Sequence, residues 1–149
     1  DYHCTEGSDV GTLRNGTTLF YLPALTQKEV YKAMANGKMV ALMGELFQES
    51  FVSEFSVSER SEPGKVMLGE EFKLNGPAII RFALNQGVPL KEARLIRNGK
   101  VIYITKSSSF EYRDEDVFAK RAPVFYRVEL AGEDGQRRLL TNPIFISWK

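Results

Sequence analysis

The sequence contains almost no cysteine and almost no histidine, two residue types on which many catalytic and metal centres depend. Its 149 residues include a single cysteine, Cys4, and a single histidine, His3. One cysteine excludes a disulfide within the chain and Cys-x-x-Cys chemistry, and one histidine excludes the His-Glu-x-x-His zinc motif. Structural zinc sites, which need four nitrogen or sulfur ligands, are excluded as well. His3 and Cys4 are adjacent, and with ligands from elsewhere they could hold a soft metal. We interpret them instead as residues near a chain end that form no site.

An excess of charge of either sign is also missing. Twenty Lys and Arg residues are balanced by nineteen Asp and Glu residues, which leaves a net charge of +1. No global field therefore draws the chain toward a phosphate backbone or an anionic membrane surface. We expect no nucleic-acid partner.

Long apolar runs are absent too. The longest, residues 39–43, is far shorter than the roughly 20 residues that span a bilayer, so we expect no membrane span. The first residues show no basic segment followed by an apolar one, and we expect no targeting signal in this sequence. With 43% hydrophobic and 26% charged residues, the composition is that of a globular protein with a real core.

The hydrophobic periodicity divides the chain near residue 50. Residues 1–50 contain one clear helix, predicted over about 27–36 between flanking strands at 17–22 and 39–43. Thr26 is the predicted N-cap, with Glu29 completing a capping box, and Leu25 and Val30 are placed as a hydrophobic staple. Gly37 supplies the left-handed residue that ends helices. This first part is a short strand-helix-strand segment.

Residues 51–149 contain only strand and turn patterns. Asn98 and Gly99 lie between two alternating runs, which is a strong signal for a hairpin with a two-residue turn. Its register would pair Leu95 with Ile102 and Ala93 with Ile104, so we expect these four side chains to share one core-facing surface.

Further strands are expected at 51–57, 71–74 and 78–84, and a second hairpin joins 124–130 to 139–141. Asn142 and Pro143 predict an interruption before the last strand, because proline cannot donate to a strand ladder. Residues 105–122 are interpreted as a long connection with a short strand, whose Phe110 and Tyr112 pack on the sandwich. The alternative is a charged binding loop. This spacing of strands predicts a mainly β fold, an antiparallel sandwich.

Two charged clusters are candidate sites, but each has a simpler explanation. Glu70 and Glu71, with Glu59 and Glu62 nearby, are interpreted as the solvated side of a turn and not as an acid-base pair. Arg137 and Arg138 are able to grip a phosphate or a carboxylate. We favour ordinary surface pairing of these arginines with the acidic residues 133 and 134 of the same hairpin.

The order of motifs resembles the final portion of one enzyme family. Residues 7–9 (Gly-Ser-Asp), Arg14, the strand at 18–22 and the helix with its Gly37-Lys38 ending are similar to the polymerase-and-histidinol-phosphatase (PHP) family of metal-dependent phosphoesterases. This match covers residues 7 to about 44. Several such proteins continue into an immunoglobulin-like β domain, and the hairpin at 97–100 and the strand start at 141–144 resemble it over residues 51–149.

The resemblance implies a chemistry that this chain carries only in part. PHP proteins are distorted (βα)7 barrels that hydrolyse phosphate esters with a metal-activated water. Only Asp9 carries over as a metal ligand, because Gly11 stands where the family has histidine. Asp9 also fits a plain turn between Gly7 and Gly11, and we prefer that interpretation. We expect no cofactor in this chain, and divalent metals only in a longer parent protein.

The immunoglobulin-like resemblance makes a further prediction about Tyr126. This residue stands two positions before the place of the antibody cysteine, which predicts a tyrosine corner whose hydroxyl bonds the backbone. Trp148 lies near the C-terminus rather than on a central strand, so the antibody Cys-Trp-Cys core is absent.

These expectations lead to one preferred function and two alternatives. The preferred function is a non-catalytic C-terminal accessory domain of a PHP-like protein, with residues 1–50 as the barrel remnant and 51–149 as an immunoglobulin-like sandwich. The first alternative is a self-standing ligand- or protein-binding sandwich, and the second a hydrolase completed by other residues or chains. The expected partner is the rest of the parent or another copy of the chain, as a homodimer, because some apolar side chains need cover: Phe20, Leu22, Val30, Met34, Val40 and Leu42.

Overall fold

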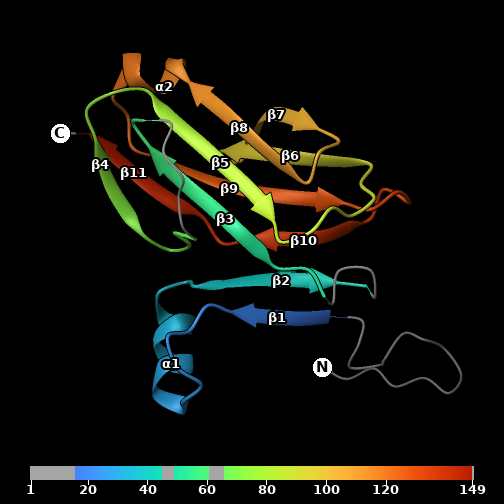
Figure 1. The fold of residues 1–149 in the computed structure, drawn as a ribbon. Helices are drawn as coiled ribbons and strands as arrows, with labels where there is room; N and C mark the ends of the chain where they lie inside the picture. Colours follow the sequence, from blue (N-terminus) through green and yellow to red (C-terminus); the bar gives the residue numbers. More distant parts are fainter. Residues whose placement is uncertain (1–15, 45–48, 61–65, 149) are drawn as a thin grey trace, which may run out of the picture.

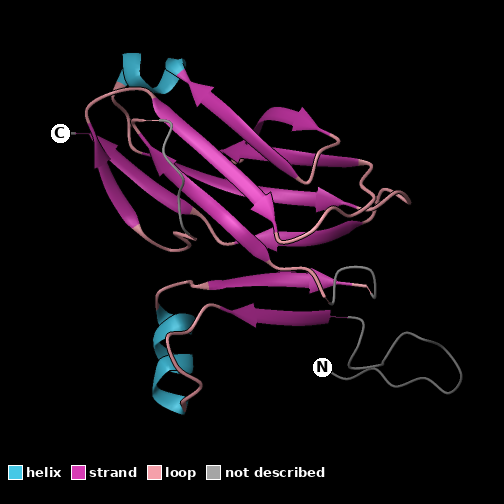
Figure 2. Cartoon of the chain, in the orientation of Figure 1, coloured by secondary structure: helices cyan, strands magenta, loops and turns pink. Residues whose placement is uncertain are grey.

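Strands make up about half of the described chain, and almost all of their pairings are antiparallel. The computed structural model describes residues 16–44, 49–60 and 66–148. Its elements are β1 (Gly16–Phe20), α1 (Gln27–Ala35), β2 (Met39–Met43), β3 (Val52–Ser58), β4 (Glu71–Leu74), β5 (Ala78–Leu84), β6 (Glu92–Arg97), β7 (Lys100–Thr105), β8 (Ser109–Asp114), α2 (Glu115–Lys120), β9 (Val124–Ala131), β10 (Arg137–Thr141) and β11 (Ile144–Trp148). Figure 2 shows how little helix there is beside the strands. The predicted mainly β fold class is confirmed.

The strands form two sheets that pack into a sandwich (Figure 1). The smaller sheet has the order β3-β5-β8. In the larger sheet β9 pairs with β6 along one edge, and β6 pairs with β7. Along its other edge β9 pairs with β10 and then with β11, so these two short strands continue one line. Beyond that line the sheet forks: β10 pairs with β2, which pairs with β1, whereas β11 pairs in parallel with β4.

The core lies between the two sheets and is built from alternating residues. In β9, Tyr126, Val128 and Leu130 are fully buried, as the alternation of that segment predicts. Aromatic rings continue the core toward β7 and β8. Phe82 stacks on Phe110 at a centroid distance of 5.6 Å, and Tyr103 lies 5.4 Å from Phe110. The predicted packing of Phe110 on the sandwich is therefore confirmed.

The β6–β7 hairpin has the predicted turn but not the predicted register. Asn98 and Gly99 both have positive φ angles, 47° and 81°, as a two-residue turn requires. The pairing then shifts, so that Leu95 lies opposite Tyr103. One extra residue in β7 reverses the direction of every later side chain. The prediction that Ile104 faces the core is wrong, because this side chain is 56% exposed.

Helix α1 begins and ends where the sequence predicts, but its N-terminus has fewer stabilising contacts than the predicted capping box and hydrophobic staple. The Thr26 hydroxyl accepts a hydrogen bond from the Glu29 backbone N–H at 3.3 Å. The reciprocal half of the capping box is replaced by an ion pair between Glu29 and Lys32 at 3.0 Å. The predicted hydrophobic staple is wrong, because the Leu25 side chain is 91% exposed. The hydroxyl cap alone marks the start of the helix.

The segment 105–122 holds more regular structure than the sequence predicts. It contains the full strand β8 and the six-residue helix α2. The charged run from Arg113 to Asp116 predicts a solvated connection, yet Asp114 is only 1% exposed. This carboxylate ends β8 and precedes α2, so part of the charged run belongs to the core rather than to the surface.

The end of α1 is fixed to the sandwich at the break between β10 and β11. The Asn142 side-chain Nδ2 donates to the Gly37 carbonyl at 3.0 Å, and the Gly69 N–H donates to the Pro143 carbonyl at 2.8 Å. A Cβ atom on Gly69 would lie 1.6 Å from the Asn36 carbonyl oxygen. Glycine is therefore required where the helix end, the segment before β4 and the strand break meet.

The remaining contacts of residues 16–44 with the sandwich are partly apolar. Pairing of β2 with β10 buries Val40 and Leu42, which the sequence predicts to need cover. The Tyr21 hydroxyl donates to the Val52 carbonyl at 2.8 Å, and burial raises the pKa of Tyr21 to about 12. Met34, by contrast, stays 50% exposed. The sandwich thus covers one side of this segment and leaves the other open.

Gly69→Ala is expected to lower the free energy of unfolding by about 3 kcal/mol or more. The new methyl group collides with the Asn36 carbonyl, and Gly69 has a φ of +71° that disfavours alanine. Urea unfolding of the purified chain measures the difference. Gly87→Ala is the matched control, because no atom lies within 4 Å of its Cβ position and its φ is not positive. Equal stability of the two variants would contradict this junction.

Candidate functional site

A pocket of about 360 Å³ opens between the β6–β7 turn, helix α2 and the start of β9. The segments that form it are separated in sequence and are brought together by the pairing of β6 with β9. Its lining residues are Arg97, Asn98, Lys100, Val101, Ile102, Asp116, Val117, Lys120, Ala122 and Val124. The volume lies within the range of small-molecule sites.

The turn that forms one wall is held rigidly against β9. The Asn98 N–H donates to the Phe125 carbonyl at 3.1 Å, and the Phe125 N–H donates to the Asn98 Oδ1 at 2.9 Å. A left-handed Asn and a following Gly allow the chain to make this tight approach. The wall is therefore already in place before any ligand binds.

A largely buried charge cluster holds Arg97, one of the residues that line the pocket. Arg97 Nη1 donates to both carboxylate oxygens of Asp114, at 2.6 and 2.7 Å. The Tyr126 hydroxyl donates to Asp114 Oδ2 at 2.9 Å. The sequence predicts a backbone acceptor for Tyr126, and that prediction is wrong: the partner is this carboxylate. Burial, and then the charge of Asp114, raise the pKa of Tyr126 well above its ordinary value of 10.

The charged side chains at the mouth of the pocket are less constrained than Arg97, which is paired with Asp114. They are Lys100, Lys120 and Asp116, and all three are exposed. In residues 16–44, 49–60 and 66–148 the ion pairs involve other side chains. The two ammonium groups are therefore available to an incoming molecule.

The residues that the sequence singles out as metal-site candidates lie outside the described residues. These are Asp9, His3 and Cys4. Glu62, which the sequence assigns to the acidic turn, also lies outside the described residues. In the part of the chain that the structure describes, no group of three or more His, Cys, Asp or Glu side chains converges on one point. Neither described helix has the length and apolarity of a membrane span.

The acidic cluster is divided among separate structural contacts. Glu70 pairs with Lys38 at 3.0 Å, and Glu71 accepts a hydrogen bond from Ser147 at 3.3 Å. Glu59 accepts from the backbone N–H of Asn75. These carboxylates thus face three different partners.

The arginine pair is divided as well. Arg138 pairs with Asp134 inside the β9–β10 hairpin, which is the surface pairing that the sequence predicts. Arg137 instead lies 3.1 Å from Glu129, a carboxylate that is only 3% exposed and that also lies 2.8 Å from Arg127. Glu129 was not singled out from the sequence, because a charged residue in an alternating strand normally indicates the solvent face.

The sequence does not mark Lys120 and Asp116 either, because the charges of the segment 105–122 indicate a solvated connection. It marks Arg97 and Lys100 only as the residues that flank a turn. No spacing in the sequence connects the turn with α2, so the pocket depends on the pairing of β6 with β9. A signal was present only at Asp114, which is the one acidic residue of its run that the alternation of β8 points inward.

Comparison with family models, with curated proteins and with solved structures gave no match.

Tyr126→Phe is expected to lower the free energy of unfolding at neutral pH by about 2 kcal/mol, because it leaves Asp114 with one donor fewer in a buried position. The raised pKa of Tyr126 also fixes the sign of a pH effect. The folded state favours the protonated phenol, so its contribution is complete below pH 10 and is lost as the pH rises above 10.

Urea unfolding from pH 7 to 11 measures both effects. Above pH 10 the stability of the native chain should fall more steeply than that of the Phe variant, by up to ~1.4 kcal/mol per pH unit. Tyr31→Phe is the control, because Tyr31 lies on α1, is 60% exposed and takes no part in the Asp114 hydrogen bonds. Identical slopes for the native chain and Tyr126→Phe would contradict the buried contact.

Proposed function

We propose that this chain is a non-catalytic accessory module of a PHP-like protein. Its sandwich carries a docking unit, defined as residues 16–44 with β1, α1 and β2, that binds the catalytic part of the parent. The resemblance to the end of a PHP barrel covers residues 7 to about 44 and so includes this unit. The proposal rests on one observation: the side of the docking unit that the sandwich does not cover exposes apolar side chains and an unpaired strand edge.

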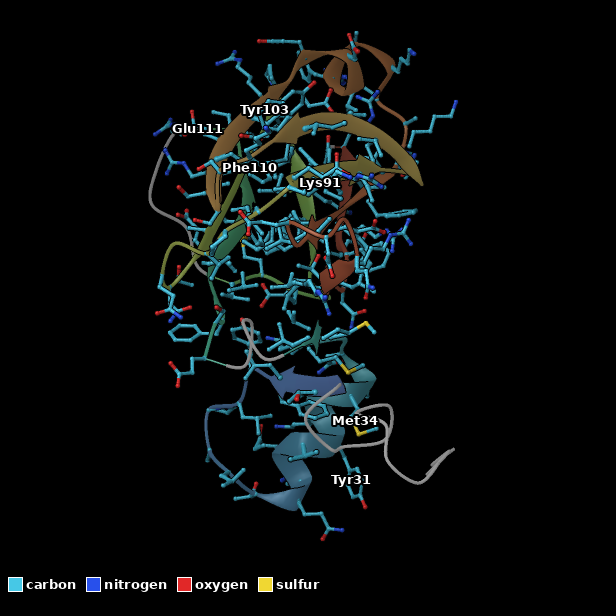
Figure 3. The ribbon with its side chains drawn as sticks, turned by 90° about the vertical axis from the view of Figure 1, so that its right-hand side faces the viewer. Tyr31, Met34, Lys91, Tyr103, Phe110 and Glu111 are labelled. Atoms are coloured by element: carbon cyan, nitrogen blue, oxygen red, sulfur yellow. The ribbon has the colours of Figure 1, made fainter. Side chains whose placement is uncertain are left out.

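Exposed apolar side chains concentrate on the docking unit. Tyr31 and Met34 of α1 are 60% and 50% exposed, and Figure 3 shows both side chains directed away from the sandwich. Leu25 and Met43, from the same unit, are also exposed. Such gathering of apolar surface marks interaction sites more often than scattered single residues do.

The unpaired edge of β1 also supports the proposal that this unit binds a partner. In the described part of the chain β1 pairs only with β2, so the backbone groups along its other edge have no strand partner. An open edge is a template for another strand, and proteins usually cover it. Because β1 and β2 are antiparallel, the docking unit does not repeat the parallel strand arrangement of a barrel. It therefore serves in this proposal as a connector between barrel and sandwich.

The sandwich itself is proposed to be immunoglobulin-like. Strands β3 and β4 belong to different sheets: β3 pairs with β5 in the smaller sheet, and β4 pairs in parallel with β11 in the larger one. This division, with β6, β9 and the β10–β11 line together in the larger sheet, supports that assignment. Tyr126 bonds the residue that ends β8, which resembles a tyrosine corner with a carboxylate acceptor.

A second candidate function is a self-standing ligand-binding sandwich. The pocket beside the β6–β7 turn favours it, because its walls are already ordered and two lysines lie at its mouth. The two functions differ in the surface they use, since the docking unit and the pocket involve different residues.

The chain alone is expected to hydrolyse p-nitrophenyl phosphate no faster than a blank that contains only Mn²⁺. Only Asp9 carries over as a ligand from the family pattern, and a catalytic site needs several converging ligands. Metal analysis after dialysis should give well below one metal per chain. Stoichiometric metal together with turnover that Asp9→Asn abolishes would contradict the proposal and favour a complete hydrolase.

Tyr31→Glu combined with Met34→Glu is expected to weaken docking without unfolding the module. In the isolated chain the melting temperature should stay within about 2 °C, because both side chains are largely exposed. In the longer protein the same pair should increase hydrogen exchange of the β1 amides. Ile104→Glu, at a similarly exposed apolar residue of the sandwich, is the control and should leave exchange unchanged.

Light scattering of the isolated chain distinguishes docking on the parent from binding to a second copy of the chain. A concentrated sample that is monomeric agrees with docking on the parent. A stable dimer that Tyr31→Glu and Met34→Glu dissolve would overturn this assignment, because the surface would then bind a second copy of the chain.

A further inference from the structure

The pocket beside the β6–β7 turn combines an apolar wall with a cationic mouth. Val101, Val117 and Val124 line it together with Ile102 and Ala122. Val101 is 46% exposed although it is a β-branched residue in a strand. A molecule in the pocket would cover this side chain and gain from the burial of apolar surface.

The charges around the pocket favour one negative charge on the ligand. Arg97 is neutralised by Asp114, whose two oxygens it contacts, so it contributes little attraction. Two lysines remain against one carboxylate, that of Asp116, which leaves one positive charge at the mouth. A dianion such as phosphate would meet repulsion from Asp116 and would lose hydration against the apolar wall.

We propose that this pocket binds a small monocarboxylate with an apolar body. The body packs against the valine side chains, and the carboxylate lies between the Lys100 and Lys120 ammonium groups. Both sides of the site are ordered in advance: Asn98 exchanges two hydrogen bonds with Phe125, and Arg97 is held by Asp114. Binding therefore orders the two lysine side chains but requires little ordering of the turn and of Arg97. This inference does not depend on the proposed docking of residues 16–44.

The test is a titration of the ¹⁵N-labelled chain with 3-phenylpropionate, followed by backbone amide shifts. The expected shifts fall at residues 98–102 and 116–124, which surround the pocket. 3-Phenylpropionamide has the same body without the charge and should bind at least tenfold more weakly. Inorganic phosphate at the same ionic strength should leave these amides unmoved.

Substitutions then locate the carboxylate. Lys100→Gln and Lys120→Gln should each raise the dissociation constant of 3-phenylpropionate about fivefold. Lys106→Gln, an exposed lysine beyond the other end of β7, is the matched control and should leave the constant unchanged. Ala122→Trp fills the pocket from its rim and should abolish the shifts while the rest of the spectrum keeps its dispersion.

Several results would overturn the inference. They are equal binding of the acid and the amide, shifts centred on residues 16–44, binding that survives Ala122→Trp, and the absence of shifts at 10 mM 3-phenylpropionate. Failure of the docking experiment would leave all these results unaffected, because Tyr31 and Met34 do not line the pocket.

Discussion

The break in the strand line formed by β10 and β11 is the constraint on which the rest of the structure depends. Pro143 has no N–H group, so the ladder with β9 is interrupted at this point. On one side of the break β10 accepts β2, and on the other side β11 accepts β4. Asn142 and Pro143 also bind the end of α1 and the segment before β4 through their polar groups. One interruption therefore determines how three parts of the chain join a single sheet.

A second constraint lies where β8 ends and α2 begins. Asp114 joins β6 through Arg97 and β9 through Tyr126, while it also precedes α2. Removing a charged group from water is expensive, and the attraction within a buried pair often does no more than compensate for it. The cluster is therefore better understood as a device that fixes geometry: it orients the turn at Asn98 and the short helix, and so gives the pocket its two walls.

Local signals in the sequence predicted local structure well, and errors arose where distant segments decide. The turn at Asn98 and the N-cap at Thr26 follow from short-range chemistry, and both are found. The predicted side-chain direction of Ile104 is wrong because a bulge in β7 shifts the register, so that Tyr103 instead contacts the aromatic rings of β8. Helix α2 was missed because charged residues normally indicate solvent, whereas Asp114 has an internal partner. The pocket was missed for a similar reason, since its walls meet only after β6 pairs with β9. The metal-ligand candidate Asp9 lies outside the described residues.

The junction between the first and last parts of the chain has a consequence for the order of folding. Asn142 and Gly37 are bonded although they are 105 residues apart in the sequence. Contacts of such long range form late, because a large loop must close first. During synthesis on the ribosome β2 therefore waits for β10, which emerges only after the strands from β3 to β9. Until β10 pairs with β2, Val40 and Leu42 lack the cover that this strand gives them, so the segment 16–44 exposes apolar surface that a chaperone or an early partner would protect.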